Sequence, residues 1–258
     1  MKIFVVIPTY NESQNLEKIV NEILAEHPSF NILIVDDNSP DGTGAIADKL
    51  SFENNHIYVI HRSKKSGLGT AYVEGFKYVL SKDADLIFQM DADLSHNPKY
   101  LKDFLICAKK TDLVIGSRYI NGVRVEGWRF RRLLLSKFAN IFVSRIMVKP
   151  VWDFTAGYRC YHRKVLETID LDKIQSDGYA FQIEMTYHTY KNGFKVCEIP
   201  ILFKERKYGH SKISRNVILE AFIMTFKCRA SIFAIIKHLS FFFKDYRTFT
   251  QDSMEDND

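Results

Sequence analysis

The stretch QMDADLSHNP, residues 89–98, places two carboxylates one residue apart shortly after the apolar run of residues 86–88. That run predicts a β-strand, and if the strand continued, Asp91 and Asp93 would point to the same face and repel each other. A positive charge between them would remove the repulsion, and a divalent cation is the simplest candidate. A hard cation held by only two carboxylates keeps open coordination positions, which the phosphate oxygens of a nucleotide diphosphate can fill.

Short apolar runs and helical patterns alternate along the first half of the chain. The apolar runs predict strands at residues 2–8, 31–37, 57–62, 85–91 and 112–118. Apolar side chains at helical spacing predict helices between them, for example over residues 12–27. This alternation predicts an α/β fold, with a Rossmann-like, mostly parallel sheet flanked by helices on both faces.

Polar side chains follow the ends of these predicted strands. They are Tyr10, Asp36, Asp37, Asp91, Asp93 and Arg118. Ligands of such sheets bind outside the carboxyl ends of the strands, so we expect these side chains to lie together. An acid at the end of the second strand can accept hydrogen bonds from a ribose hydroxyl or a base edge. The first turn, residues 8–13, lacks the G-x-G-x-x-G pattern, which disfavours a nicotinamide or flavin enzyme.

The second half of the chain is less regular. Helices are predicted over residues 133–147 and around residues 178–193. Residues 152–162 form a predicted loop that leads into a strand. A further strand is predicted over residues 194–206, and because Pro200 interrupts it, this strand should lie at an edge or a bend of the sheet.

Composition and charge limit the classes of partner. The 258 residues are 46% apolar and 26% charged, as in a soluble globular protein. The net charge is +5, and basic residues gather at 124–132, 204–212 and 227–229. Such clusters fit phosphate groups or an anionic membrane surface, and a solvated basic face is the alternative. No helix-turn-helix, zinc-finger or RNA-binding signature accompanies them, so we expect no nucleic-acid partner.

The four cysteines, Cys107, Cys160, Cys197 and Cys228, are widely spaced and form no C-x-x-C pair. This spacing indicates neither a zinc site nor a disulfide framework, and it suits a reducing compartment. The apolar stretch at the N-terminus is too short for the core of a signal peptide, so we expect no secretion.

A second apolar segment, residues 217–243, lies near the C-terminus. Charged residues interrupt it, and none of its apolar stretches approaches the ~20 residues of a membrane-spanning helix. It predicts an amphipathic helix or helix pair. Such a helix can lie on a bilayer with its Lys and Arg at the headgroups, or it can pack on the protein's own core, and the sequence leaves both readings open.

Eight motifs in collinear order carry a resemblance to a known family. They are IPTYNE (7–12), VDDNSPDGT (35–43), GLGTAY (67–72), MDADLSHNP (90–98), IGSRY (115–119), DFTAGYRC (153–160), GYAFQIEM (178–185) and KERKYGHSK (204–212). Together they resemble the family 2 glycosyltransferases with a GT-A fold, and most closely the polyprenol-phosphate (dolichol-phosphate) mannose synthases. The resemblance implies inverting transfer of mannose from GDP-mannose to a polyprenyl monophosphate, with Mg or Mn as the cation.

The resemblance also assigns roles by matching position. The residues that would hold the guanosine and ribose are Pro8, Tyr10, Glu12, Val35 and Asp37. The metal and the diphosphate would be bound by Asp91, the backbone of Ala92, and Asp93. The cations that would clamp the donor phosphates are Arg118, Arg206 and Lys212. The acceptor phosphate would meet Arg132 together with Arg118.

Two positions have roles that the resemblance does not fix. Ser95 stands where some relatives place a glutamine as a further metal ligand, and water can take that place. Asp153 matches an acidic family position, for which a contact with the donor sugar and a contact with the acceptor are both open.

The implied lipid substrate sets the expected organisation. We expect a GT-A catalytic domain over residues 1–215, an amphipathic membrane-surface segment over residues 216–245 and an acidic, disordered tail over residues 246–258. The protein would lie peripherally on the cytoplasmic face of a membrane, with a bacterial inner membrane favoured over the endoplasmic reticulum. It would dock by itself or be recruited by a small membrane subunit.

Three other functions compete with this one. A polyprenyl-phosphate glycosyltransferase that uses UDP-glucose or another sugar nucleotide would share the fold, because a fold does not fix the donor. A catalytically silent GT-A scaffold or nucleotide-binding subunit is a second alternative, which the intact Asp91 and Asp93 disfavour. A nucleotidyltransferase is disfavoured because residues 8–13 supply neither a glycine-rich loop nor a catalytic basic residue.

Overall fold

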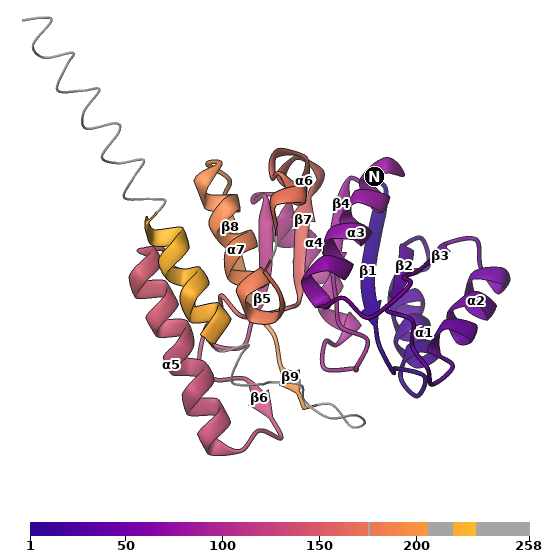
Figure 1. The fold of residues 1–258 in the computed structure, drawn as a ribbon, viewed down its shortest axis with the longest axis horizontal. Helices are drawn as coiled ribbons and strands as arrows, with labels where there is room; N and C mark the ends of the chain where they lie inside the picture. The colour runs from indigo at the N-terminus through magenta and orange to yellow at the C-terminus, as the bar shows by residue number, and fades with distance from the viewer. Residues whose placement is uncertain (175, 206–218, 231–258) are drawn as a thin grey trace, which may run out of the picture.

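The computed structural model describes residues 1–174, 176–205 and 219–230. Its centre is a seven-stranded sheet in the order β3-β2-β1-β4-β7-β5-β8 (Figure 1). The strands are β1 (Ile3–Thr9), β2 (Asn31–Asp36), β3 (Ile57–His61), β4 (Leu86–Gln89), β5 (Leu113–Ser117), β7 (Arg159–His162) and β8 (Val196–Pro200). Neighbouring strands pair in parallel except β7, which runs antiparallel to both β4 and β5. The predicted α/β fold with a mostly parallel sheet is therefore confirmed.

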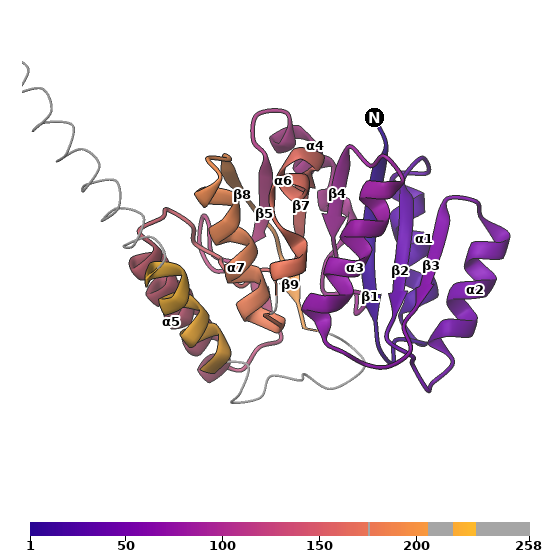
Figure 2. The same cartoon turned by 45° about the horizontal axis from the view of Figure 1, so that its top comes forward.

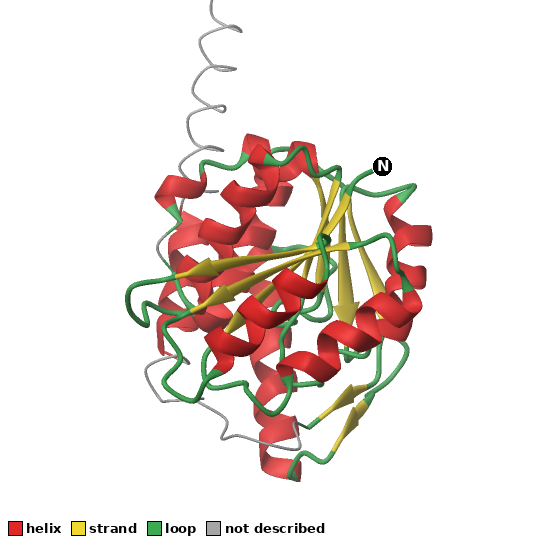
Figure 3. Cartoon of the chain, turned by 90° about the vertical axis from the view of Figure 1, so that its right-hand side faces the viewer, coloured by secondary structure: helices red, strands yellow, loops and turns green. Residues whose placement is uncertain are grey.

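Helices cover both faces of this sheet (Figure 3). One hydrophobic core cluster joins the sheet to α1 (Leu16–Glu26), α2 (Thr43–Glu53) and α4 (Leu101–Ala108). The cluster on the other face joins it to α3 (Leu68–Ser81), α5 (Phe130–Met147), α6 (Arg163–Thr168) and α7 (Gly178–Lys191). Figure 2 shows α3, α6 and α7 side by side over that second face. The 3₁₀ turns are η1 (Pro98–Tyr100) and η2 (Leu171–Lys173).

The sequence pattern explains why these segments fold as they do. All six residues of β2 are buried, as expected of a strand that helices cover on both faces. Helix α1 buries one face, as its apolar spacing predicts. The buried residues are Leu16, Ile19, Val20 and Ile23. The predicted strand with Pro200 ends at that residue as β8, which forms one edge of the sheet. Its predicted place at an edge is confirmed, because an edge strand can lack one backbone donor.

The antiparallel direction of β7 has a consequence for function. The loop before β7, residues 153–158, reaches the same edge of the sheet at which the parallel strands β4 and β5 end. A small second sheet of β6 (Val125–Glu126) and β9 (Phe203–Lys204) lies apart from the main sheet, and β9 follows β8 along the chain. The carboxyl edge of the main sheet therefore receives residues from both halves of the chain.

One disulfide corrects the expectation from the cysteine spacing. It joins Cys107 of α4 to Cys197 of β8, 90 residues apart in sequence. The expectation was wrong because distance along the chain does not measure distance across the fold, and α4 packs against β8. The other two cysteines, Cys160 and Cys228, are free and buried. The cysteines therefore no longer support a reducing compartment.

Residues 219–230 of the predicted amphipathic segment form a helix that lies beside α5 (Figures 1 and 2). Phe222 stacks on Phe142 of α5 with ring centroids 4.8 Å apart. Thr225 and Cys228 are buried, so one face of this helix packs on the protein itself. The rest of the segment and the expected tail over residues 246–258 lie outside the described residues. Within the described residues, no helix combines the length and apolar character that a membrane crossing needs.

Candidate active site

The two carboxylates of the DADLS turn lie at the carboxyl end of β4. The strand ends at Gln89, so Asp91 and Asp93 lie on a turn and not on one strand face. Asp93 is buried, and its Oδ1 accepts a hydrogen bond from the backbone N–H of Ser95 at 3.1 Å. Leu94 adopts a left-handed backbone, with φ of 63°, which turns the chain back toward η1. The turn thus fixes where the carboxylates lie.

Two buried side chains flank Asp91. The hydroxyl of Tyr72 donates to Oδ1 of Asp91 at 3.3 Å. Burial raises the pKa of the Tyr72 phenol well above its ordinary value, and the Asp91 charge raises it further, so the hydroxyl keeps its proton. On the other side, Nδ1 of His96 accepts the backbone N–H of Asp91 at 3.1 Å. Tyr72 and His96 were not predicted, because neither stands at a strand end.

These oxygens suit a hard cation. Oγ of Ser95 is buried and has no hydrogen-bond partner among the described residues. It stands two residues from Asp93, where a cation or its bound water would satisfy it. The described residues contain no group of three or more His, Cys, Asp or Glu side chains that could enclose a metal ion. The two carboxylates and the Ser95 hydroxyl fit Mg or Mn that keeps open positions for other oxygen ligands.

The residues predicted to hold the nucleoside lie at the ends of β1 and β2. Pro8 and Val35 are register partners in the β1–β2 ladder. Tyr10 follows β1, and the ammonium of Lys65 lies 3.9 Å from the centre of its ring. The backbone N–H of Glu12 donates to Oγ1 of Thr43 at 2.9 Å, which ties the first turn to α2. The structure therefore gathers these predicted residues in one region.

The two adjacent acids at the end of β2 have different surroundings. Asp36 accepts hydrogen bonds from the hydroxyls of Thr9 and Ser39, at 3.0 and 2.6 Å, and so ties the end of β1 to the loop after β2. Asp37 forms a buried ion pair with Arg62. Arg62 follows β3 and also donates to Oγ1 of Thr70 at 2.8 Å. Sequence reasoning missed Arg62, although its place directly after a strand was the available signal.

Arg118 and Asp153 form a buried ion pair. Nε and Nη2 of Arg118 donate to the two carboxylate oxygens of Asp153 at 2.7 and 2.6 Å. Burial alone would lower the pKa of the guanidinium, but the Asp153 charge and hydrogen bonds raise it above its ordinary value. The backbone N–H groups of Trp152 and Asp153 donate to Glu198 of β8, at 2.8 and 2.9 Å. Asp153 is thus fully buried and held from both sides.

Arg132 lies near Arg118 because both contact Trp128. Their guanidinium carbons lie 4.1 Å (Arg132) and 5.4 Å (Arg118) from the Trp128 ring centre. Nη1 of Arg132 also donates to Oε1 of Glu205 at 2.7 Å. The structure therefore places the two predicted acceptor-phosphate residues around one indole ring. Trp128 and Glu205 were missed, because no strand end marks them.

Phe203 of β9 links this arginine pair, Arg118 and Arg132, to the carboxylates. Its ring centre lies 5.7 Å from the guanidinium carbon of Arg118 and 5.8 Å from the ring centre of His96. His96 in turn contacts Asp91. The predicted Arg206 and Lys212 lie outside the described residues, so the site described here does not include them.

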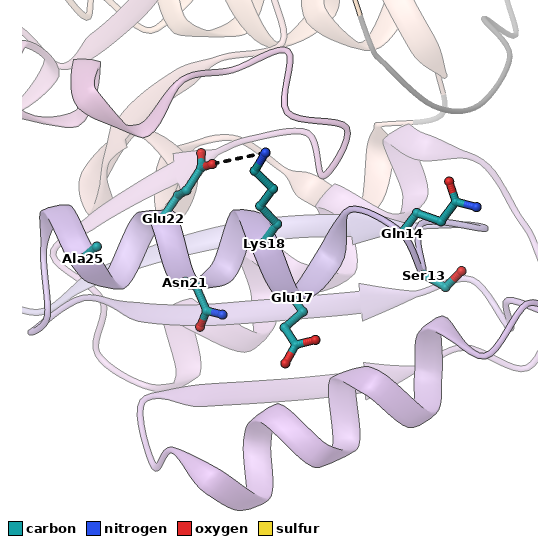
Figure 4. A pocket seen from close by; sticks show the side chains of 7 residues that line it. All are labelled: Ser13, Gln14, Glu17, Lys18, Asn21, Glu22 and Ala25. Carbon is teal, nitrogen blue, oxygen red and sulfur yellow. Dashed lines mark ion pairs between the residues drawn. The ribbon is translucent and has the colours of Figure 1, made fainter.

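Two surface hollows lie away from this group. One, of about 550 Å³, follows the solvent face of α1, where Lys18 and Glu22 pair across one helical turn at 3.9 Å (Figure 4). The other, of about 710 Å³, lies between α7 and the helix over residues 219–230. The first is lined by ordinary helix-surface side chains and does not contact the strand ends.

A mostly parallel sheet with acids and arginines at its carboxyl edge is typical of enzymes that bind phosphorylated ligands at that edge. The model of the family named glycosyl transferase family 2 matches residues 4–170. The chain therefore belongs to this family and is a glycosyltransferase, as the motifs predicted.

Two curated relatives are more specific. The chain is 48% identical over 219 residues to the polyprenol monophosphomannose synthase of Mycolicibacterium smegmatis, which covers 84% of this chain and 83% of that protein. It is 40% identical over 223 residues to the undecaprenyl-phosphate mannosyltransferase of Micrococcus luteus, covering 86% of this chain and 92% of that one.

Solved structures confirm the fold. Glucosyl-3-phosphoglycerate synthase from Mycobacterium tuberculosis, in complex with Mn²⁺, UDP-glucose and phosphoglyceric acid, superposes with a TM-score of 0.66. The match covers 89% of this chain and 80% of that one at 15% identity. The complex of the same enzyme with Mg²⁺ and UDP also gives 0.66, covering 89% and 79% at 15% identity. At this identity the likeness shows the shared GT-A fold alone.

Proposed function

We propose that the protein transfers mannose from GDP-mannose to a polyprenyl (dolichyl) monophosphate, with inversion at the anomeric carbon. The observation that carries the proposal is the convergence of Arg118 and Arg132 on Trp128, with Phe203 between Arg118 and His96 of the carboxylate turn. Guanidinium groups are strong partners of phosphate, and these two lie around one indole ring. The names of the two relatives, a polyprenol monophosphomannose synthase and an undecaprenyl-phosphate mannosyltransferase, support both the sugar and the lipid acceptor.

A divalent cation, Mg or Mn, completes the proposed donor site. Asp91 and Asp93 would hold it, with Ser95 or a water bound to Ser95 as a further ligand. When bound, the cation supplies positive charge that stabilises the departing diphosphate. The Mn²⁺ and Mg²⁺ complexes of glucosyl-3-phosphoglycerate synthase support a divalent cation in this fold.

The proposed chemistry needs positioning more than a strong base. A phosphate monoester is already mostly ionised at neutral pH, so it can attack the sugar directly. Arg118 and Arg132 would hold the attacking phosphate in line with the anomeric carbon. Asp153 would act as a positioning residue, because its fully buried carboxylate holds the guanidinium of Arg118. This role differs from the two sugar or acceptor contacts that the sequence left open.

The remaining assignments are those of the family motif. The nucleoside would be held by Pro8, Tyr10, Glu12, Val35 and Asp37. The backbone of Ala92 would bind the diphosphate, and its phosphates would also contact Arg206 and Lys212. The gathering of the first five residues at the ends of β1 and β2 supports their shared role. The pairing of Asp37 with Arg62 leaves further lone pairs on the carboxylate to accept a ribose hydroxyl.

A membrane surface is the proposed place of action. The exposed large apolar side chains of α5 are Phe130, Leu134, Leu135, Phe138 and Ile141. The neighbouring helix over residues 219–230 adds Leu219, Phe222, Ile223 and Phe226. Between its apolar residues α5 carries Arg and Lys and no acid, a composition that suits the headgroups of anionic lipids. We propose peripheral binding to the cytoplasmic face of a bacterial membrane, with residues 1–215 as catalytic domain and residues 216–245 as part of the membrane contact.

A comparison of donors tests the proposal. Purified protein is incubated with polyprenyl phosphate, a divalent cation and one labelled donor at a time, GDP-mannose, UDP-glucose or UDP-N-acetylglucosamine. We expect chloroform-extractable label from GDP-mannose alone. Label from a UDP-sugar alone would replace the proposed donor and keep the acceptor. Label from none of the donors, in liposomes as well as in detergent, would contradict the proposed reaction or require a membrane subunit.

A further inference from the structure

The carboxylate of Asp91, in the proposed metal site, contacts the side chains of Tyr72 of α3 and His96 of the same turn. Tyr72, on the first turns of α3, reaches Oδ1 of Asp91 at 3.3 Å. His96, five residues after Asp91, has Nε2 at 3.8 Å from Oδ2. The carboxylate therefore lies between a phenol from one element and an imidazole from another.

We propose that Tyr72 is a positioning residue of the metal site, whose hydroxyl holds the Asp91 carboxylate in the orientation that a divalent cation needs. This inference rests on the proposed metal role of Asp91. A ligand carboxylate that is already oriented loses less freedom when it binds the cation, so its outer hydrogen-bond partner contributes to metal affinity.

The ring of Tyr72 is itself held firmly. It is completely buried, and it stacks on Phe181 of α7 with ring centroids 5.8 Å apart and planes 7° from parallel. Phe76, one turn along α3, lies against it with centroids 5.8 Å apart. A ring enclosed on two sides by aromatic neighbours cannot swing its hydroxyl away from Asp91 without repacking the core.

His96 lies on the opposite side of Asp91. Nδ1 of His96 accepts the backbone N–H of Asp91, so in the neutral ring Nε2 carries the proton and faces the carboxylate. His96 is buried and stacks on Tyr158 with centroids 4.9 Å apart. Gly157 lies next to it, where a Cβ would be 3.4 Å from the His96 ring and 3.5 Å from Oδ2 of Asp91. Tyr72 and His96 therefore flank the carboxylate, and the Asp91 side chain, 35% exposed, keeps an open side from which a cation can approach.

The alternative is that Tyr72 serves only to fill the core. The two roles predict different behaviour for Tyr72→Phe, which keeps the ring and its stacking and removes only the hydroxyl. A packing role predicts unchanged metal affinity. A positioning role predicts weaker metal binding, by about 10- to 100-fold, which is the usual effect of losing a partner of a metal ligand.

The test is a titration of the purified protein with Mn²⁺, in the presence of GDP, in which electron paramagnetic resonance measures the free Mn²⁺. The matched control is Tyr78→Phe, which removes a hydroxyl from the same helix α3 at a half-buried position that contacts Tyr58. We expect Tyr78→Phe to bind Mn²⁺ as the wild type does and Tyr72→Phe to bind it about 10- to 100-fold more weakly. The melting temperature of both variants is measured to confirm that they are folded.

A kinetic measurement separates positioning from loss of structure. With Tyr72→Phe, we expect the Mn²⁺ concentration for half-maximal transfer to rise and the rate at saturating Mn²⁺ to stay near that of the wild type. Equal Mn²⁺ affinity in folded Tyr72→Phe and wild type would overturn this inference and leave the proposed function standing. If the wild type itself bound no Mn²⁺, the metal assignment would fail, and this inference would fail with it.

Discussion

The carboxylate of Asp153 accepts hydrogen bonds from the guanidinium of Arg118 through both of its oxygens, at 2.7 and 2.6 Å, and both side chains are buried. The pair connects the end of β5 to the loop before β7, so an arginine proposed to bind substrate is fixed by the core of the protein. A guanidinium held in this way keeps its orientation before the acceptor phosphate arrives, which lowers the cost of binding.

Replacement of Asp153 by Asn should therefore damage both stability and acceptor binding. Removing one charge of a buried pair costs about 3 kcal/mol or more, so we expect the melting temperature to fall by roughly 6–12 °C. The KM for the lipid acceptor should rise while the KM for the sugar nucleotide changes little. The control is Asp170→Asn, whose exposed pair with Lys173 should leave the melting temperature unchanged. An Asp153→Asn protein as stable as wild type would refute this account of the pair.

Glu205 forms an ion pair with Arg132 in the structure. Its carboxylate should therefore compete with the acceptor phosphate for the Arg132 guanidinium. Glu205→Gln removes the competing charge, so we expect the acceptor KM to fall by roughly 2- to 5-fold, the range that a partly exposed ion pair can contribute. The maximal rate should not fall. Glu126→Gln is the control, because Glu126 pairs with Lys204 on the adjacent β6–β9 ladder at 3.3 Å and not with Arg132. An unchanged or higher acceptor KM in Glu205→Gln would argue against Arg132 as an acceptor ligand.

Asp93→Ala should abolish sugar transfer and leave the fold intact. Asp93 lies on a turn after β4 rather than within the sheet, and its side chain accepts a local hydrogen bond from the backbone N–H of Ser95. Its loss should remove a metal ligand with little effect on the core. Transfer rate and melting curve are measured on the same preparation, and chelation of divalent cations from the wild type should give the same loss of rate. A purified Asp93→Ala protein that retained its rate would sink the metal assignment.

The apolar face of α5 should determine membrane binding. Phe138 is 76% exposed, and its burial in a bilayer contributes on the order of 2 kcal/mol. We expect Phe138→Asp to lower the fraction of protein that floats with liposomes of anionic lipid, by about 10-fold in affinity or more. Phe52→Asp is the control, since Phe52 is 92% exposed on α2, far along the chain from α5. Equal flotation of both variants and the wild type would show that α5 is not the membrane contact.

The positions of the strand-end residues could be predicted because parallel strands bring their carboxyl ends to one edge. Tyr10, Asp37, Asp91 and Arg118 each follow a strand that a short apolar run marked correctly. Arg62 directly follows β3, so the same reasoning could also have predicted it as a site residue.

The rest of the site depends on contacts that the local pattern does not contain. Asp153 meets Arg118 because β7 enters the sheet antiparallel, and the sequence of β7 carries no sign of its direction. Tyr72 reaches Asp91 only through the packing of α3 over the sheet. The disulfide between Cys107 and Cys197 likewise follows from how α4 crosses β8.

The measurement that tests the central claim most directly is the requirement for the acceptor phosphate. Purified protein, Mn²⁺ and radiolabelled GDP-mannose are incubated with polyprenyl phosphate or with the matching polyprenol that lacks the phosphate. If the arginine pair binds the attacking phosphate, label enters the lipid phase only with polyprenyl phosphate and only in the presence of the cation. Equal transfer to polyprenol, or transfer to polyprenyl phosphate that persists without any divalent cation, would contradict the account.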